Sequence, residues 1–94
     1  MILDCGGNHL TELNLSNQPG LIILDCGGNQ LTTLDLSNNS SLGVGYENTC
    51  NYYLLIHDMP TLNKVCVWTM PFPPAGFHLY KEGSPNVYFT ANCN

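Results

Sequence analysis

Positive charge is scarce in this 94-residue chain: Lys64 and Lys81 are its only strongly cationic side chains, and the net charge is −5. Without a basic patch there is little to attract a phosphate backbone, so no nucleic-acid partner is expected. Long apolar runs are also missing, and Met1 is not followed by a basic segment and an apolar core. Neither membrane insertion nor a signal peptide is therefore predicted within this chain. Strong helix formers are few and Asn and Gly are frequent, which favours turns and short strands.

Two stretches near the N-terminus are almost identical: LDCGGNHLTELNLSN at 3–17 and LDCGGNQLTTLDLSN at 24–38, offset by 21 residues. A fixed period of roughly 20–29 residues with Leu and Asn at set places is typical of a leucine-rich repeat solenoid. Leu24 and Cys26 alternate with polar or outward residues, which predicts the inner side of a short strand. Leu34 and Leu36 alternate around Asp35 and predict a second short strand on the opposite wall. Each coil buries its apolar side only by stacking on the next.

The pattern LDCGGNQLTTLDLSNN resembles the cysteine-containing, 21-residue leucine-rich repeats of internalin J and of many Bacteroidetes surface proteins. The resemblance covers residues 1–42 and implies a mostly β solenoid of about four short coils. In that family such repeats form the extracellular recognition part of long, multi-domain adhesins, and there are no catalytic residues to carry over. A secreted or bacterial cell-surface location is the corresponding expectation.

Four residues are expected to form ladders inside the stacked coils. Cys5 and Cys26 occupy an inward place where Leu normally sits, and a buried thiol behaves there as a small hydrophobe. This structural interpretation is favoured over a catalytic or metal-binding one. Asn8 and Asn29 lie where the chain leaves the strand, and their amides are expected to bond backbone groups stranded at the bend.

The repeat weakens after residue 42, so residues 43–67 are predicted as irregular coils and residues 1–42 as regular ones. Shortening the third coil by one residue restores a register in which Leu54 matches Leu34 on the second wall. At an offset of 41 residues, Val65 then matches Leu24 on the first wall, and Cys66 takes the outward place of Asp25.

Residues 68–94 contain four of the six prolines and two strand-like runs, 77–80 and 87–90. The open end of a solenoid needs a cover, and this segment is predicted to be a β-rich C-terminal cap. It also resembles the C-terminal end of Bacteroidetes leucine-rich repeat domains. With that resemblance, a Cys66–Cys93 disulfide is expected to tie the cap to the last coil. A Cys50–Cys93 bridge is the main alternative. Five cysteines in so short a chain favour an oxidising compartment.

The first residues correspond to the middle of a repeat, since Ile2 matches Ile23. The expectation is therefore a C-terminal piece of a longer repeat protein whose first coil is uncovered. A bare strand edge and apolar core predict self-association of copies through that coil.

Residues suited to catalysis or metal binding show no recognisable motif. The histidines His9, His57 and His78 fall in outward or turn places and have no metal-ligand spacing, so no metal site is expected. A set of Cys93, His78 and Asp58 can be drawn as nucleophile, base and acid, but only geometry gives such a set meaning. The prediction is a non-enzymatic protein that needs no cofactor.

The concave strand face is the expected binding surface, because solenoids usually bind there. Ile2, Asp4, Ile23 and Asp25 are the predicted ligand contacts, and the partner is a host or cell-surface protein or glycan. Protection of an exposed sheet is the alternative interpretation of the two aspartates. The alternative function is a structural cap or spacer of a longer repeat array, with no ligand site of its own.

Overall fold

The computed structural model describes residues 2–44 and 52–93, which contain seven short strands and no helix. The expectation of a mostly β fold is confirmed for these residues. The strands are β1 (Ile2–Asp4), β2 (Ile23–Asp25), β3 (Thr33–Asp35), β4 (Leu54–Leu55), β5 (Lys64–Cys66), β6 (Leu79–Tyr80) and β7 (Tyr88–Thr90).

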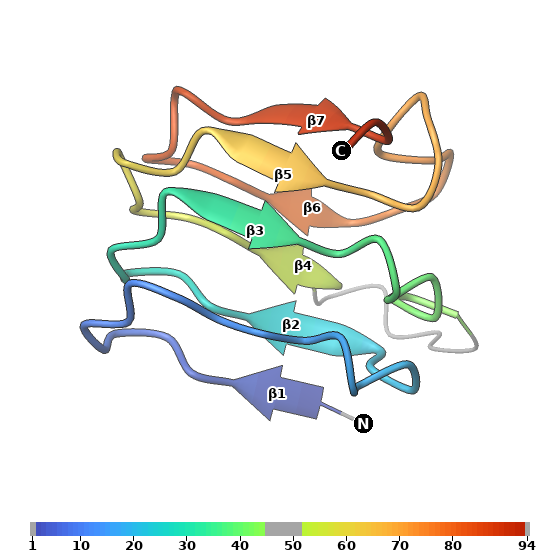
Figure 1. Ribbon diagram of the computed structural model, residues 1–94, viewed down its shortest axis with the longest axis horizontal. Helices are drawn as coiled ribbons and strands as arrows, with labels where there is room; N and C mark the ends of the chain where they lie inside the picture. The colour runs from blue at the N-terminus through green and yellow to red at the C-terminus, as the bar shows by residue number, and fades with distance from the viewer. Residues whose placement is uncertain (1, 45–51, 94) are drawn as a thin grey trace.

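The strands form two parallel sheets, which are called here the first sheet (β1-β2-β4-β6) and the second sheet (β3-β5-β7). From β2 onward, successive strands alternate between the two sheets. Figure 1 shows the sheets as two layers whose strands point in opposite directions. The folded chain is compact, with extents of 30 × 29 × 25 Å.

The sequence period sets the pairing of the first two strands. Ile2 pairs with Ile23, Leu3 with Leu24 and Asp4 with Asp25, so the 21-residue offset is also the strand register. Because side chains alternate along a strand, the central Leu of each strand points to the core while Ile and Asp face outward. The predicted strand around Leu34 is present as β3.

The register predicted for the third and fourth coils is wrong. Leu54 pairs with Leu24 in the first sheet, and Val65 pairs with Leu34 in the second sheet. Each residue therefore lies on the wall opposite to the predicted one. The connection from β3 to β4 is longer than the corresponding one in the first repeat, so the offset between these paired strands is 30 residues (Leu24 to Leu54). Alternating apolar residues alone fit either wall, so they do not fix the register.

The core is built mainly from leucines of the strands and of the connections between them, and the other members of the cluster are Cys26, Ile56, Met59, Val65, Val67 and Phe72. Burial falls towards β1. The inward residues of the first repeat are only partly buried, whereas their counterparts in the second repeat are buried: Leu3, Cys5, Leu10 and Leu13 against Leu24, Cys26, Leu31 and Leu34. β1 pairs only with β2 among the described residues, so its outer edge is open.

Residues 68–93 supply the last strand of each sheet, β6 and β7. The same segment contains an aromatic cluster in which Phe72 contacts Trp68, Phe77 and Phe89, with ring centroids 4.8–5.3 Å apart. The disulfide expected between Cys66 and Cys93 is confirmed and joins β5 to the residues after β7. The Cys50–Cys93 alternative is excluded because Cys93 is already bonded, and Cys50 itself lies outside the described residues.

Candidate functional site

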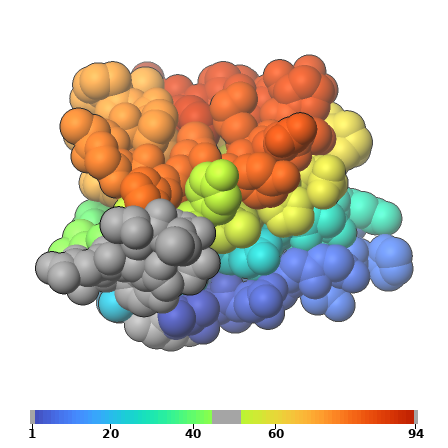
Figure 2. All heavy atoms as spheres, turned by 180° about the vertical axis from the view of Figure 1, so that it is seen from behind, coloured from blue at the N-terminus to red at the C-terminus, as the bar shows by residue number. Residues whose placement is uncertain are grey.

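The outward residues of the first sheet form a continuous row across its strands. Asp4 pairs with Asp25, Asp25 with Leu55 and Leu55 with Tyr80. Figure 2 looks onto this side of the molecule, where the blue, cyan, yellow-green and orange segments follow one another upward. The parallel register therefore brings residues from distant parts of the sequence into one surface strip.

A surface cavity of about 330 Å³ lies on this strip and is called here the outer-face cavity. It brings together all four residues predicted as ligand contacts. Ile2 is 59% exposed at its rim, whereas Ile23 is only 7% exposed and forms part of its wall. The complete lining is Ile2, Leu3, Asp4, Ile23, Asp25, Tyr52 and Leu55.

The two aspartates are fixed in the same way by the local backbone. One oxygen of each, Oδ1, accepts a hydrogen bond from the N–H two residues later: Gly6 N at 3.2 Å for Asp4 and Gly27 N at 3.1 Å for Asp25. This is the turn that Asp forms where a strand ends. Within the described residues, the Oδ2 atoms of Asp4 and Asp25 have no hydrogen-bond partner.

His57 adds a polar group that the sequence did not assign to this face. Its Nε2 lies 3.5 Å from Asp25 Oδ1, and its Nδ1 lies 2.9 Å from Asp58 Oδ2. The Tyr80 ring lies 5.2 Å from the His57 ring and 4.9 Å from that of Tyr52. The predicted register places His57 in a turn, whereas the observed pairing of Leu55 with Asp25 brings it to this face.

Gly27 leaves the space that His57 occupies. A Cβ at Gly27 would overlap the imidazole ring, whereas a Cβ at Gly20 would meet no heavy atom within 4 Å. Gly27→Ala is therefore expected to displace His57 from Asp25 and to lower the free energy of unfolding by about 1–3 kcal/mol, as overpacking does. Urea unfolding and the NMR shift of the His57 ring protons measure the two effects. Gly20→Ala is the matched control, and equal behaviour of the two variants would contradict the expectation.

The four residues predicted to form ladders differ in burial: Cys26 and Asn29 are buried, Cys5 is partly buried and Asn8 is exposed. Asn29 Nδ2 donates to the carbonyls of Cys26 at 2.9 Å and Cys5 at 3.0 Å, and Asn29 Oδ1 accepts from Leu10 N at 3.1 Å. Asn8 is exposed, and its Nδ2 donates to Cys5 O at 2.9 Å, within its own repeat. Asn29 thus links the two copies, whereas Asn8 does not.

Cys5 and Cys26 are free thiols. Burial raises the pKa of Cys26 to about 12, with a smaller contribution from the neighbouring Cys5. Burial, followed by the Asp25 carboxylate, also raises the pKa of Cys5. Since the thiolate is the nucleophile and metal ligand, both residues are suited to packing.

The residues that could be drawn as a catalytic set do not form one. The Cys93 sulfur is bonded to Cys66 and cannot act as a nucleophile, and Asp58 contacts His57. Within residues 2–44 and 52–93, no three His, Cys, Asp or Glu side chains are grouped to hold a metal ion. In the same part of the chain, no helix is long and apolar enough to cross a membrane.

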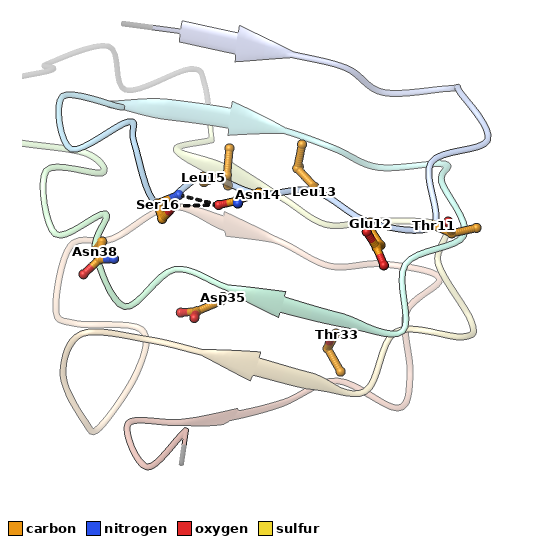
Figure 3. Close-up of a pocket in the computed structure, with 9 residues that line it drawn as sticks. All are labelled: Thr11, Glu12, Leu13, Asn14, Leu15, Ser16, Thr33, Asp35 and Asn38. Atoms are coloured by element: carbon orange, nitrogen blue, oxygen red, sulfur yellow. Dashed lines mark hydrogen bonds between the residues drawn. The ribbon is translucent and has the colours of Figure 1, made fainter.

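A second cavity, of about 370 Å³, lies beside β3 and is called here the second-sheet cavity (Figure 3). It is open and mostly polar, and it contains no residue predicted as a contact. Its carboxylates are Glu12 and Asp35. The Oδ1 atom of Asp35 accepts hydrogen bonds from Ser37 Oγ at 2.6 Å and Ser37 N at 2.9 Å, which lower the pKa of this carboxyl group. Asn14 and Ser16 repeat this arrangement one copy earlier, with Oδ1 accepting from Oγ at 2.7 Å. The same motif in both copies identifies a turn that recurs with the sequence.

Comparison with protein-family models, curated proteins and solved structures found no match.

Proposed function

We propose that this chain is a non-catalytic binding module of the leucine-rich repeat type, and that it binds a protein or glycan on the outer face of its first sheet. The observation that carries the proposal is the single cavity that unites Ile2, Asp4, Ile23 and Asp25. Concave faces of solenoids are their usual binding surfaces. A solenoid arrangement is supported by the alternation of strands between two parallel sheets and by the turns that repeat with the sequence.

The proposed setting is a secreted or bacterial cell-surface protein that acts in adhesion. The Cys66–Cys93 disulfide supports an oxidising compartment, because such bonds persist outside the reducing cytosol. A further part of the proposal is self-association of two copies through the open edge of β1. The partly buried Leu3 and Leu10 beside that edge favour such contact.

Binding by the purified chain to a glycan array and to a peptide array tests the function. The wild type is expected to bind probes on one of them, and the Asp4→Ala/Asp25→Ala double variant is expected to lose at least about tenfold in affinity, as removal of charge-assisted hydrogen bonds does. The control is Glu12→Ala/Asp35→Ala, which removes the same charge from the second-sheet cavity. Circular dichroism checks that all three proteins are folded.

Two outcomes would overturn the proposal. Undiminished binding by the folded Asp4→Ala/Asp25→Ala variant would remove the site from this face. A folded wild type that binds no probe on either array would favour the alternative, a structural cap or spacer. The observation behind that alternative is that only two copies of the repeat are regular.

A further inference from the structure

We propose that the outer-face cavity receives an arginine side chain of a partner protein. This inference rests on the proposed function, because it assigns a partner chemistry to the same site.

The walls of the cavity suit the aliphatic part of a long side chain. Ile2, Ile23 and Leu55 contribute apolar surface from three adjacent strands, and Asp4 and Asp25 stand in register beside them. Arginine places its methylene stem along apolar surface while its charged end remains at the polar rim. The cavity therefore offers separate surfaces to the two parts of this side chain.

The polar groups of the cavity are suited to a ligand that only donates hydrogen bonds. Asp4 and Asp25 lie on neighbouring strands, which are spaced about 4.8 Å apart, and each has an Oδ2 atom with no hydrogen-bond partner among the described residues. Both are carboxylates that accept and cannot donate when ionised, and a guanidinium has five N–H donors and no acceptor. A sugar hydroxyl both donates and accepts, so this cavity matches it less well.

The chain itself provides no lysine for these carboxylates. Lys64 lies in the second sheet, and neither it nor Lys81 forms an ion pair with Asp4 or Asp25 within the described residues. His57 contacts Asp25 through Nε2, which lies 3.5 Å from Oδ1. With a net charge of −5 and no arginine in the sequence, the face attracts a cationic partner.

Tyr52 supplies an aromatic surface at the same site. Its side chain is 42% exposed, and its ring lies 4.9 Å from that of Tyr80. A guanidinium stacks on a tyrosine face more favourably than an ammonium does, because it is planar and more weakly hydrated. This selects arginine over lysine.

NMR titration of the ¹⁵N-labelled full chain with acetylated pentapeptides tests the inference. The central residue is arginine, citrulline or lysine, and glycines flank it. Saturable shifts are expected at Ile2–Asp4 and Ile23–Asp25 with the arginine peptide. Citrulline has almost the same shape without the charge, and we expect its peptide to bind at least about tenfold more weakly. The lysine peptide is expected to bind more weakly than the arginine peptide.

The Asp4→Asn/Asp25→Asn variant is expected to lose at least about tenfold in affinity for the arginine peptide. The control variant Asp35→Asn should bind this peptide like the wild type. Equal affinity for citrulline and arginine, or binding unaffected by Asp4→Asn/Asp25→Asn, would overturn the inference. If the wild type binds a glycan through Asp4 and Asp25 and ignores the arginine peptide, the proposed function stands and the inference fails. If the folded wild type binds neither peptides nor glycans, both fail.

Discussion

Replacing Cys66 and Cys93 together with alanine is expected to lower the free energy of unfolding by about 3.5 kcal/mol, the chain-entropy value for the loop that this disulfide closes. The sequence separation across the bond is 27 residues, and the bond ties β5 to the end of the segment that carries β6 and β7. Without it, the unfolded chain regains the freedom of that loop. For a domain of this size the midpoint of thermal unfolding should fall by roughly 15–25 °C.

Urea unfolding of the wild type with and without reductant, beside the double variant, measures this effect. Reduced wild type should resemble the variant, and reductant should leave the variant unchanged. Cys5→Ala is the control, because Cys5 is a free and only partly buried thiol. Equal unfolding midpoints for the oxidised wild type and the double variant would show that the disulfide does not add to the free energy of unfolding.

Replacing Asn29 with alanine is expected to lower the free energy of unfolding by about 3 kcal/mol. Asn29 is 5% exposed, and its loss leaves the Leu10 N–H and the Cys5 and Cys26 carbonyls without this partner. Each buried polar group left unsatisfied destabilises a protein by about 1–3 kcal/mol. The effect should exceed that of a typical surface substitution several-fold.

The repeat provides a matched control at the equivalent position. Asn8→Ala removes the same side chain from the preceding copy, where it is exposed and bonds only within its own repeat. We expect Asn8→Ala to cost less than about 1 kcal/mol, as a solvent-accessible hydrogen bond does. Equal losses in urea unfolding would show that the link between copies carries none of the stability assigned to it.

The first half of the fold could be predicted because its sequence repeats. A 21-residue copy fixes which residues of β1 and β2 face each other, and alternation assigns Leu24 to the core and Asp25 to the surface. The second half lacks that constraint. In the run Leu54-Leu55-Ile56 every residue is apolar. The run therefore indicates neither which sheet the strand joins nor which of its side chains point into the core. The length of the connection before β4 decides the wall, and no repeated residue marks that length.

The candidate site could be predicted in part for the same reason. The four expected residues share one cavity because they belong to the regular copies. Leu55 and His57 join them only through the pairing of β2 with β4, which the sequence misassigned. Ile23 illustrates a different limit: its outward direction follows from alternation, but its exposure of 7% depends on what packs over it.

The connection between Cys66 and Cys93 also has a mechanical consequence. When the two ends of the chain are pulled apart, tension passes from one sulfur to the other and bypasses the residues between them. That stretch would otherwise contribute roughly 90 Å of contour length, at about 3.4 Å per extended residue. The terminal strands β6 and β7 are therefore held within a closed loop under load, and only a reductant releases this hidden length.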